Sequence, residues 1–227
     1  MRLISILVAA CIFSVAHAEQ DEEKNTDPWM GLNQVSYGIN NVADTIILKP
    51  LATGYQTVTP VPLRRGVKNF FGNLGDVNNS VNNLLQGKLL ASGGDLLRLV
   101  INSSMGIGGL FDVASAMGLN KHNESFGQTL SVWGVPAGPY VVIPLLGPST
   151  LTDAITNPLN TALDPIRFLH PVSHRNSLFG FRAIEQRATL LAAESAVFGD
   201  RYIFLRDAYL QRRNYLVLDG NVEEEEF

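Results

Sequence analysis

Apolar residues recur at helical spacing along much of this chain. The clearest run spans residues 63–84, where apolar side chains follow one another at alternating steps of four and three positions. This spacing places them on one face of an amphipathic helix, which Gly72 and Gly75 could split or bend. The members of this apolar face are Leu63, Val67, Phe70, Leu74, Val77, Val81 and Leu84.

The same spacing predicts the other helices. Asp27 is placed to cap a first helix that starts at Pro28 and ends before Pro50. Prolines within residues 158–171 argue against long helices there. Because no segment alternates with a period of two, we expect an all-α single domain over residues 27–220. Further helices are predicted over residues 89–102, 111–117, 126–133 and 183–198, and a last one after a turn and cap at Gly199 and Asp200.

The polar face of the 63–84 helix carries almost no charge. A helix that faces water usually shows Lys and Glu, whereas this face is rich in asparagine. Two interpretations fit: the face lines a wet, neutral passage, or it packs against another polar surface. Under the first interpretation Asn69, Asn73 and Asn83 are the candidate channel-lining residues.

Residues 126–148 are apolar enough for a membrane but too interrupted to cross one. Proline removes a backbone donor and clashes with the preceding helical turn, so no continuous apolar helix of about 20 residues can form. Irregular backbone can lie at membrane depth only where protein or a polar cavity satisfies its polar groups. We therefore interpret this stretch as a wall or gate of a protein that handles lipid. The gate or hinge candidates are Gly134, Pro136, Gly138, Pro139, Tyr140 and Gly147.

The composition also points toward a membrane surface. Charged residues make up only 17% of the 227 residues, against about 25% in an average soluble domain. The mean hydropathy is +0.11. The formal net charge of −4 arises from acids at the two ends, and the rest of the chain is mildly basic. This mild excess suits anionic head groups, but the dense Lys/Arg clusters expected for nucleic acid are missing.

The two ends are predicted to lie outside the folded domain. Residues 1–18 have a basic start, an apolar run and a small-residue ending, which predicts a secretory signal peptide cleaved after Ala18. Residues 19–26 form an acidic linker that we expect to be disordered, and residues 221–227 form a solvated acidic tail. Cys11 offers an alternative, because the segment that it ends is similar to a lipobox whose cysteine becomes acylated. We favour the ordinary signal, since few residues precede Cys11.

No motif for catalysis, metal binding or a cofactor withstands inspection. Ser104 lies in a segment similar to a hydrolase nucleophile elbow, but the first glycine and the preceding strand are missing. His170 and His174 have the spacing of two metal ligands on a helix, but Pro171 lies between them and no acid or cysteine is near. The glycines within residues 106–109 form no phosphate loop. We therefore expect a protein that is not an enzyme and has no metal or cofactor.

Ordered motifs occur along almost the whole of residues 27–220. They lie at residues 27–29 (DPW), 49–52 (KPLA), 83–87 (NLLQG), 102–109 (NSSMGIGG), 112–114 (DVA), 126–130 (FGQTL), 133–136 (WGVP), 138–140 (GPY), 144–149 (PLLGPS) and 206–212 (RDAYLQR). Together they resemble the MlaA (VacJ) family of outer-membrane phospholipid-transport proteins of Gram-negative bacteria. So many motifs in the same order make a chance match implausible.

The resemblance implies a ring of amphipathic helices around a central channel, embedded in the inner, periplasmic leaflet of the outer membrane after Sec-type export. It implies that glycerophospholipids misplaced in the outer leaflet pass through the channel to a periplasmic carrier protein of the same pathway. It also implies association with a trimeric porin. The low charge, the amphipathic helices and the interrupted apolar stretch agree with these expectations.

Two other hypotheses stay open from the sequence. A structural or scaffolding protein of the outer membrane would embed the same helices and bind porins without moving lipid. A lipid hydrolase would require Ser104 as its nucleophile. Changes at Asn69, Asn73 and Asn83 separate transport from scaffolding, because only transport predicts a loss of lipid flux.

Overall fold

The computed structural model of the protein describes residues 26–221. The predicted signal peptide and Cys11 lie outside the described residues, as does nearly all of both acidic terminal segments. The helices are α2 (Met30–Ala43), α3 (Lys49–Val58), α4 (Val61–Leu85), α5 (Leu89–Ser104), α6 (Val113–Ala116), α7 (Phe126–Val132), α8 (Leu151–Ala162), α9 (Val172–Leu190) and α10 (Arg201–Val217). Two strands, β1 (Tyr140–Ile143) and β2 (Gly147–Thr150), form an antiparallel hairpin.

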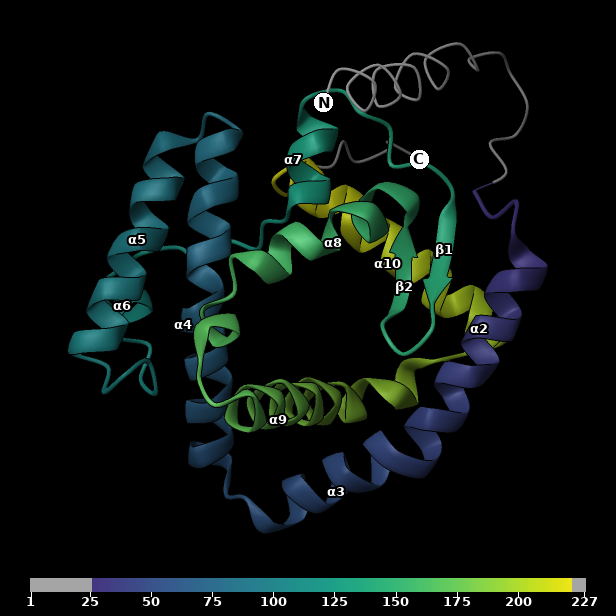
Figure 1. Cartoon of the computed structure of the whole chain (residues 1–227), viewed down its shortest axis with the longest axis horizontal. Coiled ribbons are helices and arrows are strands. Elements are labelled where there is room, and N and C mark those ends of the chain that lie inside the picture. Colours follow the sequence, from purple (N-terminus) through teal and green to yellow (C-terminus); the bar gives the residue numbers. More distant parts are fainter. Residues whose placement is uncertain (1–25, 222–227) are drawn as a thin grey trace.

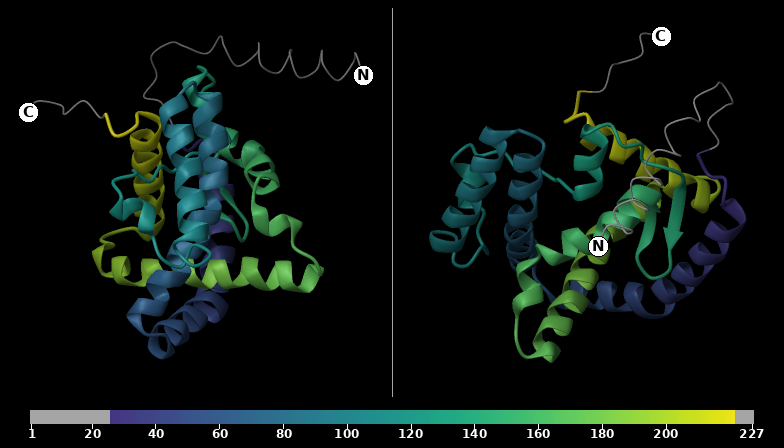
Figure 2. Two further views of the ribbon diagram at one scale, coloured as in Figure 1. Left: turned by 90° about the vertical axis from the view of Figure 1, so that its left-hand side faces the viewer. Right: turned by 45° about the horizontal axis from the view of Figure 1, so that its top comes forward.

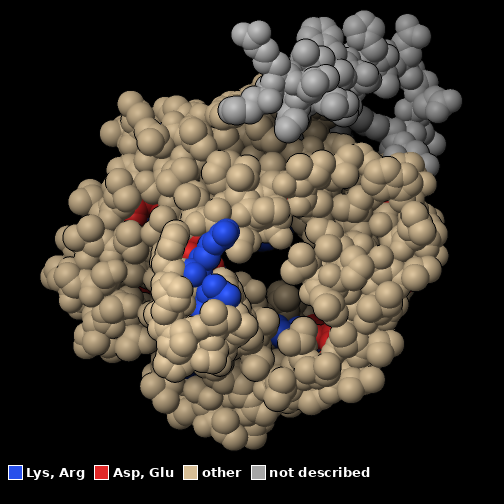
Figure 3. Space-filling model, in the orientation of Figure 1, with Lys and Arg blue, Asp and Glu red and all other residues tan. Residues whose placement is uncertain are grey.

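The elements are arranged around an opening. In Figure 1, α4, α8, the hairpin and α9 border this opening, and α5 and α6 lie on the side of α4 that faces away from it. Helices α2 and α3 form part of the outer edge, and α9 crosses α4 and α5 at a steep angle (Figure 2). The space-filling view shows that side chains leave the opening unfilled (Figure 3).

The strongest predicted helix is confirmed. Helix α4 runs over 25 residues without a break, so Gly72 and Gly75 do not split it. Helix α5 follows after a short turn and packs along α4. The two short helices expected at 111–117 and 126–133 are present as α6 and α7. The cap predicted at Asp200 is also confirmed, because its carboxylate accepts hydrogen bonds from the backbone N–H groups of Tyr202 and Ile203.

The predictions at the first helix were wrong in two respects. Asp27 does not cap α2, because Trp29 holds the cap position and the Asp27 carboxylate bonds instead to the side chains of Asn33 and Tyr202. Pro50 does not end the helical run. A wider π-helical turn over Asp44–Leu48 leads directly into α3, and Pro50 lies in the first turn of α3, where a missing N–H is tolerated.

The predicted boundaries in the C-terminal half were also wrong. Helix α8 contains Pro158 and still spans 12 residues, although we expected no long helix there. Helix α9 runs over Val172–Leu190 rather than 183–198, and a 3-10 turn over Leu191–Ala196 follows it. Pro171 immediately precedes α9, so it starts this helix instead of preventing one.

The predominantly helical fold is confirmed, with the β-hairpin as an unpredicted addition. Its register pairs Tyr140 with Thr150 and Ile143 with Gly147. Each strand has only four residues, and the β2 sequence Gly-Pro-Ser-Thr carries no apolar alternation. Strands this short give no periodic signal, so the sequence pattern could not reveal them.

Burial is reversed relative to an ordinary soluble domain over much of the structure. Most of the largest fully buried side chains are polar, among them Arg98, Asn82, Asn83, Asp76 and Asp95. Large apolar side chains are exposed instead, including Leu90 at 94%, Val58 at 78% and Leu32 at 72% relative exposure. Within residues 26–221 no helix combines the length and apolar character needed to cross a membrane.

Candidate functional site

The β-hairpin borders the opening and is held by asparagines of α2. The Asn33 amide donates to the Tyr140 carbonyl oxygen (3.0 Å) and accepts from the Val142 N–H (2.8 Å). Two helical turns later, the Asn40 amide donates to the Ile143 carbonyl oxygen (3.0 Å) and accepts from the Leu145 N–H (2.6 Å). These side chains bond to the free edge of β1 as a third strand would. The hairpin is therefore positioned by α2, about 100 residues away in sequence.

The tip of the hairpin exposes two leucines. Leu145 and Leu146 are 75% and 68% exposed, and Leu145 adopts a positive φ of 65°. A β-turn with an apolar residue in the left-handed region is uncommon, because L side chains are strained there. The tip thus presents an apolar surface at the edge of the opening (Figure 1).

Most of the predicted hinge residues lie in the segment before β1, and Gly147 lies at the tip of the hairpin, where β2 begins. Gly134, Gly138 and Gly147 all have positive φ angles, of 90°, 70° and 94°, which favour glycine. Hydrogen bonds from the start of α8 hold the segment between them. The Pro136 carbonyl oxygen accepts from the Thr152 hydroxyl (2.8 Å), and the Pro139 carbonyl oxygen accepts from the Leu151 N–H (3.0 Å). The hinge assignment stays a prediction, and any motion has to break these bonds.

Tyr140 belongs to the aromatic core rather than to an exposed hinge surface. Its ring is 2% exposed and meets the rings of Tyr202 and Tyr209 at centroid distances of 6.3 and 6.1 Å. Burial, together with the negative charge of Asp27, raises the pKa of Tyr140 to about 12. Burial and a hydrogen bond to Asp27 likewise raise the pKa of Tyr202. Tyr140 therefore anchors β1 against α10.

The three predicted channel-lining asparagines contact the outer helices. Asn73 Nδ2 donates to Ser103 Oγ (3.0 Å), and Asn83 Nδ2 donates to Asp95 Oδ2 (2.8 Å). Asn69 Nδ2 donates to the carbonyl oxygen of Leu110, beyond α5 (3.2 Å). Because α5 lies on the far side of α4 from the opening, these contacts match the packing interpretation (Figure 1). A channel-lining role for the three residues stays a prediction that their contacts do not support.

A buried charged network connects α4 and α5. The Arg98 side chain is 1% exposed and donates two hydrogen bonds to the Asp112 carboxylate, at 3.0 and 3.1 Å. Its Nε lies 3.6 Å from Asp76 Oδ2, and Asp76 also accepts a hydrogen bond from Lys121. Burial would raise the pKa of Asp112, but hydrogen bonds from Ser115, Asn102 and Arg98 lower it to about 2. Burial raises the pKa of Asp76 despite the opposing charge of Lys121.

A polar cavity of about 380 Å³ lies between the hairpin, α4, α7, α8 and α10. Its lining includes the apolar hairpin residue Leu146 and uncharged amides from several elements, which are Asn79, Asn123, Gln128, Asn157 and Asn160. The sequence interpretation expected neutral polar groups of this kind on α4, whereas most of the amides that line this cavity come from other elements. Asp153, Asn157 and Asn160 follow a spacing of four and three, so this polar face of α8 could have been found from the sequence.

One arginine of the cavity is neutralised and its neighbour is not. Arg213 Nε donates to Asp153 Oδ2 (2.7 Å), to which the Tyr209 hydroxyl also donates (2.6 Å). Burial would raise the pKa of Asp153, but the bonds from Arg213 and Tyr209 lower it, so the carboxylate stays charged. Arg212 also lines the cavity, and no acidic side chain of the described residues pairs with it. Glu124, the other acid of the lining, accepts a hydrogen bond from the Gln86 amide and lies 3.5 Å from Lys88 Nζ. To a ligand the cavity therefore offers neutral amides and one cation that forms no ion pair within residues 26–221.

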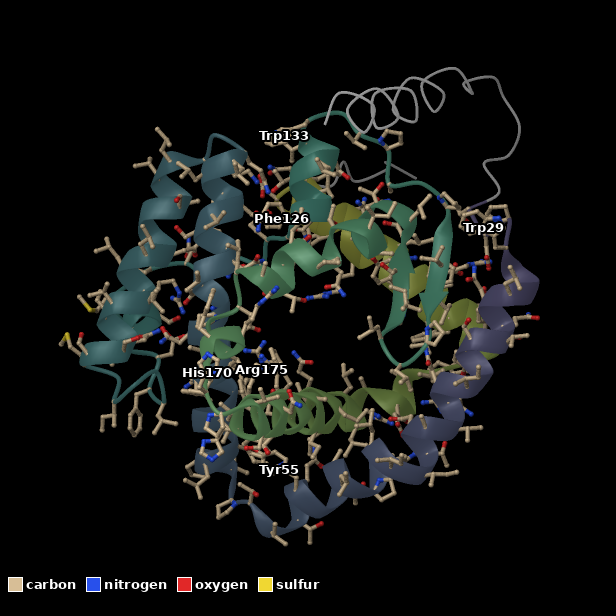
Figure 4. All side chains as sticks on the ribbon, in the orientation of Figure 1. Trp29, Tyr55, Phe126, Trp133, His170 and Arg175 are labelled. Carbon is tan, nitrogen blue, oxygen red and sulfur yellow. The ribbon has the colours of Figure 1, made fainter. Side chains whose placement is uncertain are left out.

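Basic side chains also lie at the rim of the opening. Figure 3 shows Lys and Arg side chains gathered there. Figure 4 places Arg175 at the edge of the opening near the start of α9. Within residues 26–221 no carboxylate forms an ion pair with Arg175. The rim can therefore attract a negatively charged group.

The residues considered for catalysis or metal binding are not assembled into such a site. The Ser104 hydroxyl donates to the Val100 carbonyl oxygen of its own helix (2.6 Å). His170 and His174 are both exposed to solvent. Among the described residues, no three His, Cys, Asp or Glu side chains converge as a metal site would require.

Comparison with known proteins identifies relatives over most of the chain. The sequence profile of a family described as MlaA lipoprotein matches residues 25–216. The intermembrane phospholipid transport system lipoprotein MlaA of Shigella flexneri is 32% identical over 217 residues, which cover 93% of this chain and 86% of the relative. Its Escherichia coli counterpart is 32% identical over 218 residues with the same coverage. An uncharacterized protein of Rickettsia bellii is 34% identical over 192 residues, covering 82% of this chain and 75% of the relative.

A solved structure shares the fold as well. It was described under the words "Structural basis for maintenance of bacterial outer membrane lipid asymmetry". It aligns with a TM-score of 0.73 and 32% sequence identity over 84% of this chain and 98% of that chain. At this identity the similarity extends beyond the fold to the family.

Proposed function

Because this chain belongs to the MlaA lipoprotein family, we propose that it acts in intermembrane phospholipid transport and that its opening is the lipid route. In this proposal glycerophospholipids leave the outer leaflet of the outer membrane through the opening. A periplasmic carrier protein of the same pathway then receives them. The relatives of Shigella flexneri and Escherichia coli are named as lipoproteins of an intermembrane phospholipid transport system, which supports this proposal.

The observation that carries the proposal is the reversal of burial. Leu32, Leu90 and Leu97 project from the outer helices, whereas the cavity and the α4–α5 contact are polar. In water each exposed leucine forgoes about 1.5–3 kcal/mol of burial, which an acyl-chain environment restores. With no spanning helix among the described residues, such a surface fits one leaflet rather than both. We place the protein in the periplasmic leaflet of the outer membrane.

In this proposal the lipid head group contacts polar side chains of the cavity, and the acyl chains contact the apolar hairpin tip. A phosphate-bearing head group without polar partners would cost several kcal/mol to bury. Arg212, Asn157 and Asn160 supply such partners in the cavity. Leu145 and Leu146 at the hairpin tip supply an apolar surface for acyl chains. No bond of the lipid is made or broken along this route.

The partners beyond lipid follow from the family and form part of the proposal. A trimeric porin would hold the protein in the outer membrane, and the soluble carrier would dock at its periplasmic side. The outward apolar surface supports contact with membrane-embedded structures of either kind, lipid or protein. Attachment through Cys11 agrees with the relatives' description as lipoproteins. Mass spectrometry of the mature N-terminus distinguishes acylated Cys11 from a chain that starts at Glu19.

Filling the cavity tests the route. We expect Asn157→Trp to block it, because an indole ring occupies much of a volume of about 380 Å³. Cells that carry only this variant should accumulate phospholipid in the outer leaflet and become sensitive to detergent, as cells without the protein should. Asn214→Trp on the exposed face of α10 is the matched control and should behave as wild type. Normal lipid levels with a stable Asn157→Trp protein would favour the scaffolding hypothesis.

Stiffening the segment before β1 tests the predicted gate. Alanine at Gly134 and Gly138 is strained at their positive φ angles, and a Cβ at Gly138 lies 3.1 Å from the Leu151 Cβ. We expect Gly134→Ala with Gly138→Ala to raise outer-leaflet phospholipid, measured as above. The double change Gly93→Ala with Gly94→Ala in α5 is the control, because both positions are open and helical. Wild-type lipid levels in both double variants would contradict a gate at these glycines.

A further inference from the structure

A second cleft lies between α3, α4 and α9, away from the opening. It has a volume of about 220 Å³, several times the roughly 30 Å³ of one water molecule. Figure 4 shows Tyr55 between α3 and α9, on the side of α9 that faces away from the opening. The cleft is therefore separate from the lipid route proposed above.

The cleft is lined by cations that lack partners. Arg64, Arg65 and Lys68 all come from the first two turns of α4 and all line it. The N-terminal end of a helix carries a partial positive charge, so cations there are unfavourable unless an anion compensates them. The first turn of α4 contains no acid, and no ion pair within residues 26–221 involves these three side chains. Glu185 is the acid in the cleft, which leaves an excess of positive charge.

Two buried donors in the cleft also lack acceptors. The Tyr55 hydroxyl and the Arg64 Nε are each shielded from solvent and have no hydrogen-bond partner among the described residues. Burial and the Glu185 carboxylate raise the pKa of Tyr55, so its hydroxyl keeps the proton and stays a donor. A buried donor without an acceptor costs about 1–3 kcal/mol, so a ligand that accepts from both would be favoured.

The chain next to the cleft is apolar and exposed. Val58 at the end of α3 is 78% exposed, and Val61 and Leu63 at the start of α4 are 47% and 62% exposed. A soluble anion such as inorganic phosphate has no apolar part that could contact this surface. A phospholipid has one, because its acyl chains can lie against Val58, Val61 and Leu63 while its phosphate enters the cleft.

We propose that the cleft between α3, α4 and α9 binds the phosphate of an anionic phospholipid and so retains the protein at the membrane surface. Arg64 and Arg65 contribute the planar donors that match phosphate oxygens, and Lys68 contributes a point charge. The excess positive charge favours a head group of net negative charge over a zwitterionic one. This site supplies membrane binding whether or not lipid passes through the opening.

Neutralising the exposed cations tests the site. Arg65→Gln with Lys68→Gln removes two positive charges from the cleft, and Gln211→Glu with Asn214→Asp on α10 changes the net charge equally at a distance. We expect the affinity for vesicles of phosphatidylethanolamine and phosphatidylglycerol in equal parts to fall on the order of tenfold in the cleft variant. The α10 variant should keep its affinity, and phosphatidylcholine vesicles should bind all proteins equally. Equal affinities of the cleft and α10 variants would overturn the proposal.

Two further measurements identify the ligand and separate this site from the route. Tyr55→Phe removes one buried donor and should weaken phosphatidylglycerol binding severalfold without changing the net charge. If inorganic phosphate protects the wild type against thermal unfolding but phosphatidylglycerol does not, the site takes a free anion and the lipid assignment is wrong. Asn157→Trp leaves the cleft intact and should bind the vesicles as wild type, so failure of the transport route would not be mistaken for failure of this site.

Discussion

Helices α4 and α5 meet through asparagine, aspartate and arginine side chains, whereas the hairpin and α10 meet through aromatic rings. In the first region Asp76, Asp95 and Arg98 are almost fully buried, and neighbouring leucines point outward. In the second, Tyr140, Val142 and Tyr202 form a buried cluster with partly buried Tyr37, Tyr209 and Leu210 around it. One chain thus contains an ordinary core and an inverted one.

The two regions suit different surroundings. Burying charged groups is favourable only when every charge finds partners, as Arg98 does with Asp112. Exposing leucine is favourable only where the surroundings are apolar. The α4–α5 pair therefore fits the acyl-chain surroundings proposed above, whereas the β-hairpin and α10 enclose an ordinary apolar core.

The largest effect is expected for the buried arginine. Arg98→Met leaves Asp76 and Asp112 without their buried partner and should lower the free energy of unfolding in detergent by about 3–5 kcal/mol. Leu97→Ser, at the adjacent exposed position, is the control and should cost at most about 1.5–3 kcal/mol, because it loses the apolar contact of one leucine with detergent but breaks no buried ion pair. Chemical unfolding followed by circular dichroism measures both. If Leu97→Ser were the more damaging change, the inverted-core interpretation would fail.

A smaller effect is expected in the aromatic cluster. Tyr202→Phe removes the hydrogen bond from the tyrosine hydroxyl to the Asp27 carboxylate but keeps the ring. Hydrogen bonds to charged groups contribute about 1.5–3 kcal/mol, so the same unfolding measurement should register a loss in this range. Tyr215→Phe is the control, because its ring is 54% exposed. Equal stabilities of the two variants would mean that the Asp27 bond adds nothing.

The remaining effects should appear at the extremes of pH and differ between the regions. The pKa of Asp112 is lowered to about 2 in the folded protein, from an ordinary value of about 3.9. Its contribution to stability is therefore present above about pH 4 and is lost as the pH falls toward about 2. The pKa of Tyr140 is raised to about 12, so its contribution is present below about pH 10 and is lost as the pH rises toward about 12.

Variants isolate these two contributions. The unfolding midpoint of Asp112→Asn should fall less steeply than that of the wild type as the pH is lowered. The midpoint of Tyr140→Phe should fall less steeply than that of the wild type as the pH is raised. The raised pKa of Asp76 acts in the opposite direction on the acid side, so the difference between variant and wild type is the informative quantity. An acid limb that Asp112→Asn leaves unchanged would assign that limb to other carboxylates, such as Glu194, whose bonds from Lys49 and Arg187 lower its pKa to about 2.

Local sequence determined the helices of this protein and several of their boundaries. The periodicity of residues 63–84 predicted α4, and Asp200 predicted the start of α10, because helical spacing and capping depend on neighbours a few positions apart. The motifs quoted above were enough to identify the family, because their order along the chain can be recognised without knowledge of three-dimensional contacts. Local rules failed at the first helix, which continues through a π-helical turn past Pro50. They also failed at β1 and β2, which the sequence pattern did not predict.

Tertiary structure decided which face of each helix is buried and where the polar cavity lies. Periodicity divides α4 into two faces, but it does not say which one meets protein, since that depends on the surroundings and on α5. The hairpin depends on Asn33 and Asn40, and the cavity depends on the pair Asp153 and Arg213, which are 60 positions apart. Contacts across such distances leave no periodic trace in the sequence, because each is a single pairing that only the completed fold brings together.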